Sequence, residues 1–324
     1  MRGAGHIVRR LSSTRRAAAG ALTLVLISLV TFFATNVVPN DPARIALGRG
    51  ATEQQLAAYR AEQGLDEPVV KRYARWVADF ATGDWGTSTR TRRAVRSEVL
   101  PRLERSATIA VVAMLIAVPL ALLIGTWLGR RAGRPVDVGA SLGLLLVNSL
   151  PEFVIGLLTL VVFAVWLGVL PVESSGAAFA TGWDAARAYV LPTLTLVAVV
   201  TPYMARMVRV HVRETIGQSY VRTAILRGVP PRRLTWRHIV PNAAIPVVNI
   251  VALNMAELLG GLVVVEVVFG FPGLGQLLVD SVLGKDIPSV QAIALIAGVG
   301  FVVINAVADV IVLALNPRLR ARPT

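Results

Sequence analysis

The chain has 324 residues, of which 55% are hydrophobic and 16% charged, and its mean hydropathy is +0.64. This composition is too apolar for an ordinary soluble domain and is typical of a polytopic membrane protein. The net charge of +14 comes from arginine blocks that border apolar segments, as the positive-inside rule requires, which argues against nucleic-acid binding. The absence of cysteine excludes disulfides and thiolate metal sites, and three scattered histidines make no metal cluster.

Six charge-poor stretches are long enough to cross a bilayer, for which a helix needs about 20 apolar residues. The first follows five arginines, but its 22 residues exceed the apolar region of a secretory signal, so we expect an uncleaved anchor. The sequence therefore predicts an all-α polytopic membrane protein with six transmembrane helices, at 17–38, 107–128, 137–170, 188–205, 243–265 and 287–315.

Arginine distribution predicts the orientation of these spans. The short segments 1–16, 129–136, 206–242 and 316–324 carry 5, 3, 8 and 3 arginines, whereas the loops 171–187 and 266–286 have only Arg187 and Lys285 as basic residues. The long segment 39–106 also carries arginines, but long loops cross the membrane largely regardless of charge. Arginine-rich short segments stay in the cytoplasm. Both termini are thus expected inside the cell, with the chain in the plasma (inner) membrane.

The stretch 137–170 is long enough for two short crossings and contains Pro151 and Glu152 in its middle. Two crossings would place the arginine-rich segment 206–242 outside, against the positive-inside rule. We therefore predict one kinked or partly re-entrant helix, interrupted where the proline lacks its N–H.

Residues 39–106 form one large external segment, which together with the first span makes an N-terminal part, 1–106, ahead of a five-span core, 107–324. Thr52 and Gln55 form a capping-box pattern, and an apolar stripe at helical spacing follows Pro68, so this insertion is expected to be helical. It is either a small lid on the membrane core or a docking surface for an external partner.

The chain lacks the residues for ATP hydrolysis. Neither of its two lysines, Lys71 and Lys285, fits the phosphate-binding pattern G-x-x-x-x-G-K-[ST], so a coupled ATPase has to be a separate subunit. Ion coupling within the chain is the alternative, and the polar residues of the spans are its candidates. We favour a role in interhelical hydrogen bonds or in a polar pathway over a proton relay; these residues are Asn148, Glu152, Asn254, Glu257, Asn305 and Asp309.

Within the arginine-rich segment, residues 219–227 predict a short helix with one apolar face, formed by Tyr220, Val221, Ala224 and Ile225. Gly228 is expected to end it in a left-handed conformation, and Pro230-Pro231 precede a second short helix over 232–239. Such a helix either lies on the lipid surface or inserts into a groove of a partner protein.

This segment resembles the cytoplasmic signature of binding-protein-dependent ABC importer permeases, E-A-A, three residues, G, nine residues, I-x-L-P. With Gly228 on the signature glycine, Arg222, Thr223 and Ala224 fall on E-A-A and Pro241 on the proline. His238 and Val240 replace the expected Ile and Leu. The branch that handles dipeptides, oligopeptides and nickel commonly reads Y-V-R-T-A there, as this chain does, and three further motifs resemble that branch: 40–43, 83–88 and 266–275.

The resemblance implies a non-catalytic membrane subunit of an importer for di- or oligopeptides. It implies a second, homologous permease subunit, two cytoplasmic subunits that bind ATP and Mg, and an external solute-binding protein. The contact with the ATPase is expected on the coupling helix, through Tyr220, Val221, Arg222, Thr223, Ala224 and Gly228. The chain itself is expected to hold no cofactor. A nickel-chelate or glutathione-type substrate remains open, as does an ion-coupled secondary transporter.

The motif at 266–275 contains a Pro-Gly turn at the membrane border. It is either a turn that caps the spans or an element that gates the external mouth of the cavity. The candidate residues are Glu266, Phe269, Pro272 and Gly273.

Overall fold

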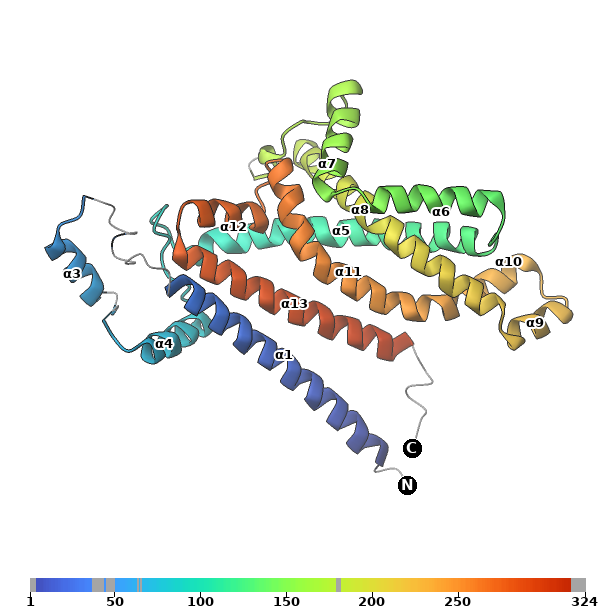
Figure 1. The fold of residues 1–324 in the computed structure, drawn as a ribbon, viewed down its shortest axis with the longest axis horizontal. Coiled ribbons are helices and arrows are strands. Elements are labelled where there is room, and N and C mark those ends of the chain that lie inside the picture. Colours follow the sequence, from blue (N-terminus) through green and yellow to red (C-terminus); the bar gives the residue numbers. More distant parts are fainter. Residues whose placement is uncertain are drawn as a thin grey trace. The chain divides into compact units, whose positions relative to one another are not determined.

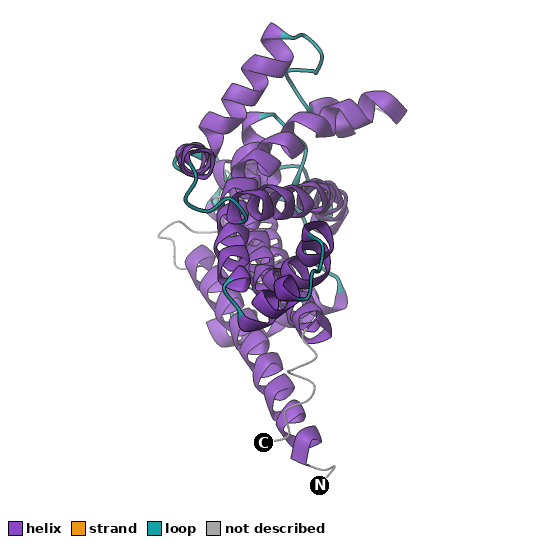
Figure 2. Cartoon of the chain, turned by 90° about the vertical axis from the view of Figure 1, so that its right-hand side faces the viewer, coloured by secondary structure: helices purple, strands orange, loops and turns teal. Residues whose placement is uncertain are grey.

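All regular elements in the described part of the chain are helices, as predicted (Figures 1 and 2). The computed structural model describes residues 4–36, 44, 50–62, 64, 66–178 and 182–315. The helices, including the π-helices η1 and η3 and the 3-10 helix η2, are α1 (Ala4–Asn36), α3 (Glu53–Glu62), α4 (Val69–Thr82), α5 (Val95–Gly129), α6 (Pro135–Asn148), α7 (Glu152–Leu160), η1 (Val161–Trp166), η2 (Ser175–Ala178), α8 (Gly182–Ile216), α9 (Ser219–Leu226), α10 (Pro231–Leu234), η3 (Thr235–Ile239), α11 (Val240–Val268), α12 (Leu274–Leu283) and α13 (Ile287–Leu315).

Four helices of the described part are long and apolar enough to cross a membrane: α1, α5, α8 and α13. The pair formed by α6 and α7 with η1 is a fifth candidate. The remaining predicted stretch, 243–265, falls within the 29 residues of α11, whose side chains are described only in part. Two helices are longer than the predicted spans: α5 begins at Val95, before the predicted 107, and α8 continues to Ile216, beyond the predicted 205.

The predicted interruption at Pro151 is confirmed. Helix α6 ends at Asn148, α7 begins at Glu152, and the two axes differ by 100°. Pro151 itself is extended, with φ −58° and ψ 146°. Proline cannot donate to the preceding turn and disfavours helical conformation in the residue before it, so the helix stops and restarts in a new direction.

The chain forms two compact units, the first comprising residues 1–104 and 277–302, the second residues 105–276 and 303–324. In the first unit the described residues 50–62, 64 and 66–104 of the predicted external segment include helices α3 and α4 and the start of α5, as expected of a helical insertion. The Thr52 capping box is present, since the Thr52 N–H donates to Gln55 Oε1 at 2.9 Å and the Gln55 N–H to Thr52 Oγ1 at 3.3 Å. Helix α4 packs its aromatic side chains on Phe32 of α1, with the Phe32 ring centroid 5.4 Å from Tyr73 and 5.6 Å from Trp76.

The second unit is built on close packing of α5 against α8. A Cβ on Gly125 would overlap the Ala205 carbonyl and the Val208 side chain, and one on Gly129 would lie 2.7 Å from Val212 Cγ1. Small residues that let two backbones approach are typical of helix pairs in membranes. Helix α8 also contacts α6, α7 and α11, so it is the central element of this unit.

Candidate functional site

Helix α9, the predicted coupling helix, is held against α8 by one of its faces. Val221 is completely buried, and with Ala224 it packs on Val208 and Val212 of α8. The cluster also includes Leu234 and Ile239 from the segment after Gly228. The helix is therefore fixed to the rest of the second unit by an apolar core of its own.

The predicted apolar face of α9 consequently divides into two. Val221 and Ala224, which we expected to contact a partner, lie on the inner side. Tyr220 and Ile225 keep 40% and 54% of their surface exposed beside that inner side, and Leu226 is 82% exposed. Arg222 and Thr223 are exposed as well. Sequence periodicity predicted the helix but could not show which of its apolar residues are buried against the rest of the chain. It also left Leu226 out of the apolar residues.

Gly228 ends α9 as predicted. Its φ is +74°, its N–H donates to the Ile225 carbonyl at 2.9 Å, and the next N–H, of Val229, donates to Ala224 at 3.1 Å. A Cβ on Gly228 would meet nothing within 4 Å, so the requirement for glycine is conformational. The predicted second helix is present too, but it begins at Pro231 and runs through η3 directly into α11.

If α9 couples this chain to an ATPase, as the resemblance implies, Gly228→Ala should reduce transport, because a left-handed residue with a Cβ costs about 1–2 kcal/mol and the strain is relieved by re-orienting α9. Gly217, between α8 and α9, is the matched control, since its φ is not positive and alanine there finds ordinary contact at 3.4 Å. Uptake by the two variants at equal membrane abundance is the measurement. Equal uptake would show that the chain reversal at Gly228 is not needed.

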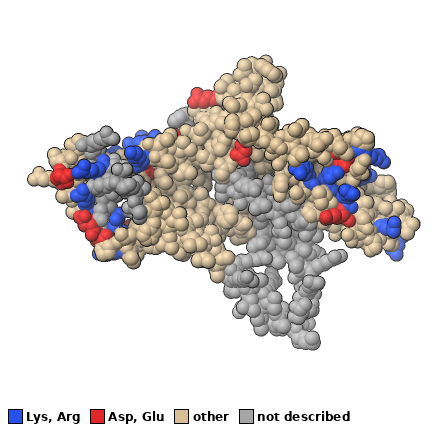
Figure 3. Space-filling view, in the orientation of Figure 1, with Lys and Arg blue, Asp and Glu red and all other residues tan. Residues whose placement is uncertain are grey.

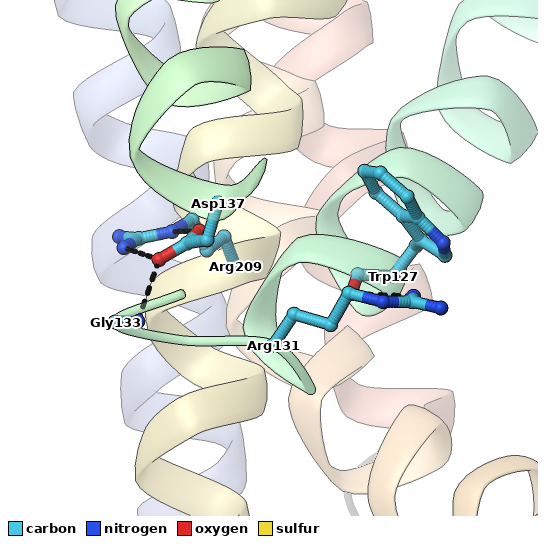
Figure 4. A network of polar contacts seen from close by, with 5 residues as sticks. All are labelled: Trp127, Arg131, Gly133, Asp137 and Arg209. Atoms are coloured by element: carbon cyan, nitrogen blue, oxygen red, sulfur yellow. Dashed lines mark hydrogen bonds and ion pairs between the residues drawn. The ribbon is translucent and has the colours of Figure 1, made fainter. Parts of the chain in front are cut away.

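An ion pair holds α8 in place about one turn before Val212, which belongs to the apolar cluster with α9. Asp137, at the start of α6, is completely buried, and Arg209 of α8 donates to both of its oxygens, Nε to Oδ1 at 2.5 Å and Nη2 to Oδ2 at 2.6 Å. The Gly133 N–H donates to Oδ2 at 2.9 Å (Figure 4). The pair thus ties the turn between α5 and α6 to the helix that leads into α9. Sequence reasoning counted Arg209 only as an orienting charge.

Glu266, at the end of α11, organises the turn into α12. It is completely buried, and its Oε1 accepts a hydrogen bond from Ser106 Oγ at 2.5 Å. Its Oε2 accepts from the N–H groups of Gly275 and Gln276, at 2.7 and 3.0 Å, which are free donors of the first turn of α12. Ser106 Oγ in turn accepts from the Leu274 N–H at 2.7 Å.

The other candidates of this motif belong to the same packed turn. Phe269 is 1% exposed and packs in the core of the second unit, and the Pro272 carbonyl accepts from Arg105 at 3.1 Å. Gly273 lies against the Glu266 carboxylate so closely that a Cβ would overlap it. The arrangement is a hydrogen-bonded cap between two helices.

The polar candidates of the spans lie on several helices. Asn148 is exposed at the end of α6, and Glu152, beyond the Pro151 break, reaches Gly261 of α11, where a Cβ would be 2.6 Å from its carboxylate oxygens. Asn305 is half-buried on α13. The side chains of the other three, Asn254, Glu257 and Asp309, lie outside the described residues, as does the 40–43 motif.

Basic side chains of the second unit gather at one end, around the turn between α5 and α6 and around α9 and α10, and the rest of its visible surface is nearly free of charge (Figure 3). The uncharged surface corresponds to the apolar spans. This end of the unit also carries the outward face of α9.

Two family profiles match the chain. "Binding-protein-dependent transport system inner membrane component" matches residues 117–321, and the N-terminal profile of such membrane components matches residues 9–94. The chain belongs to the binding-protein-dependent ABC transport permeases. This confirms the predicted family and the location in the inner membrane.

Relatives of the permease cover almost its whole length. It is 37% identical over 302 residues to the glutathione transport system permease protein GsiC of Salmonella paratyphi A, which covers 92% of this chain and 95% of that protein. GsiC of Escherichia coli K12 is 36% identical over the same coverage. Among solved structures, inward-facing conformations of the methionine ABC transporter MetNI match with a TM-score of 0.55 and 17% identity, covering 65% of the permease and 93% of that chain. This last likeness concerns the fold.

Proposed function

We propose that the permease forms the translocation pathway for short peptides of the glutathione type. Family membership makes it a permease subunit of an ABC importer, which implies an ATPase and a solute-binding protein as partners and sets aside an ion-coupled carrier. The relatives named above are glutathione permeases, which supports a small peptide substrate over a nickel chelate. The chain acts without catalytic residues, and ATP and Mg are bound by the partner subunits.

The proposed assembly has a second homologous permease and two ATPase subunits. Six spans with both termini in the cytoplasm would place the arginine-rich end of the second unit at the ATPases. The separate N-terminal and core profiles support a division into an anchor with an external segment, 1–106, and a core, 107–324. We assign a polar pathway or interhelical role to Asn148, Glu152, Asn254, Glu257, Asn305 and Asp309.

The observation that carries the coupling role is the outward face of α9. Leu226 and the exposed parts of Tyr220 and Ile225 present apolar surface, while Val221 fixes the buried side of the helix to α8. A helix anchored on one side and apolar on the other is suited to insert into a groove of an ATPase and to transmit its movement to α8. Arg222 and Arg227 flank this face and suit charge pairs at the rim.

We expect Leu226→Asp to reduce co-purification of the ATPase subunits about tenfold, because a carboxylate would have to be desolvated at the centre of the contact. Leu226→Met, which keeps the apolar contact, is the control. The measurement is the ATPase recovered with a tagged permease, together with substrate-stimulated ATP hydrolysis. If the aspartate variant recovers as much ATPase as the methionine variant, α9 is not the coupling helix.

The identity of the substrate can be tested on the solute-binding protein that delivers it. Isothermal titration of the cognate solute-binding protein with glutathione, a dipeptide and a nickel chelate should show tight binding of glutathione or a related short peptide. Binding of the nickel chelate alone would overturn the peptide assignment and leave the permease role intact.

A further inference from the structure

A groove of about 420 Å³ lies at the end of the second span, where α5 meets η3. It opens to the surface of the second unit, beside the turn that holds Asp137. Its lining combines apolar, aromatic and basic side chains: Leu123, Ile124, Thr126, Trp127, Arg130, Arg131, Thr235 and Trp236.

The groove has positive charge without a counter-ion in the described part of the chain. Neither Arg130 nor Arg131 forms an ion pair with a described acidic residue. Arg131 lies with its guanidinium carbon 4.5 Å from the centre of the Trp127 ring and donates to the Trp127 carbonyl at 3.5 Å (Figure 4). This contact holds the cation at the groove and leaves further N–H groups of the guanidinium available to an anion.

A buried hydroxyl adds a second, independent sign of a ligand. Thr126 lines the groove and is only 5% exposed, yet its Oγ1 has no hydrogen-bond partner among the described residues. A buried polar group without a partner is costly, and such groups are normally satisfied. Rotation of the Thr126 side chain towards the groove would bring this hydroxyl, which is buried as it stands, to a ligand oxygen that supplies the missing partner.

The walls fit an acyl chain. Leu123 is 52% exposed on the membrane-spanning part of α5, and Trp127 of α5 and Trp236 of η3 are 44% and 50% exposed in the lining of the groove. Tryptophans at the end of a span mark the boundary between hydrocarbon and water, where the ring is apolar and its N–H is wet. The groove therefore runs from apolar side chains inside the span to arginines just beyond its end at Gly129.

We propose that this groove binds an anionic phospholipid of the cytoplasmic leaflet. The phosphate would lie between Arg130 and Arg131 and accept from Thr126, and the upper acyl carbons would lie along Leu123 between the two tryptophans. Arginine suits phosphate because its planar guanidinium donates two parallel hydrogen bonds. The inference rests on the proposed cytoplasmic placement of the turn between α5 and α6, which the Leu226 variants test separately.

Native mass spectrometry of the purified transporter complex, with phosphatidylglycerol and phosphatidylcholine of identical acyl chains in equal amounts, tests the proposal. We expect preferential retention of phosphatidylglycerol and about a tenfold loss of that preference in Arg130→Gln/Arg131→Gln. Arg232→Gln/Arg233→Gln is the matched control, because it removes two neighbouring, exposed arginines of α10 outside the groove lining. Thr126→Val, which keeps the side-chain shape, should lower retention without changing net charge.

Four results would overturn the proposal. Equal losses in the two double-arginine variants would indicate general attraction to charge. Release of phosphatidylglycerol by millimolar inorganic phosphate would identify a free anion as the ligand. Binding to the isolated permease that disappears in the assembled transporter would show that a partner subunit covers the groove. If the Arg130/Arg131 variant does not elute as a single species, unchanged lipid retention by Thr126→Val would refute the site.

Discussion

Replacing Asp137 with alanine is expected to destabilise the permease by about 3 kcal/mol, since it leaves a largely buried guanidinium without its partner. Arg209 is 22% exposed and has both of its donated bonds directed at this carboxylate. The substitution also removes the acceptor of the Gly133 N–H. The turn between α5 and α6 would then lose its connection to α8.

The double variant Asp137→Ala/Arg209→Met distinguishes the loss of the ion pair from the cost of a single unpaired charge. It removes both charges and leaves an apolar stem beside α6, so its midpoint of thermal unfolding should lie above that of Asp137→Ala alone. Intrinsic tryptophan fluorescence during heating in detergent is the measurement. Equal unfolding temperatures for wild type and Asp137→Ala would mean that the ion pair contributes nothing to the fold.

Substrate uptake by the double variant tests whether the ion pair helps to transmit the movement of α9 through α8. Arg209 lies between the membrane-spanning part of α8 and Val212, on which Val221 of α9 packs. If α8 transmits the movement of α9, a double variant of restored stability should still transport poorly, because α6 and α8 no longer move together. Full transport would restrict the ion pair to a role in stability.

Local patterns predicted most of the helices. The Pro151 break, the Thr52 capping box and the left-handed Gly228 each depend on the conformational limits of a few neighbouring residues, so they can be read from a single sequence. The ends of the helices could not be predicted in this way, because α8 continues beyond the apolar stretch that identifies a span, through a part that contains Arg206, Arg209 and Arg213.

Contacts between distant residues were not predictable. Asp137 and Arg209 are 72 positions apart, and Ser106 and Glu266 are 160 apart, so no periodicity relates them. The same limit explains α9: its apolar residues were correctly identified, but only the position of Val208 and Val212 decides that Val221 faces inward. An acid at the very start or end of an apolar stretch, as Asp137 and Glu266 are, was the available signal.

Replacing Glu266 with alanine is also expected to destabilise the permease strongly. Three donors would lose their acceptor in a buried site: Ser106 Oγ and the N–H groups of Gly275 and Gln276. Each unsatisfied buried donor costs about 1–3 kcal/mol, so the turn into α12 should no longer hold its conformation. Val267→Ala is the matched control, since that neighbouring side chain is 43% exposed.

Thermal unfolding and transport together decide what Glu266 does. If it is a cap, Glu266→Ala should unfold at a clearly lower temperature than Val267→Ala, and Gly273→Ala, whose Cβ would overlap the carboxylate, should act in the same direction. If Glu266→Ala keeps the wild-type unfolding temperature and loses transport, the cap interpretation is wrong and the motif gates the external mouth. The hydrogen bonds favour the first outcome, because a carboxylate that holds three donors on α5 and α12 keeps the turn in one conformation.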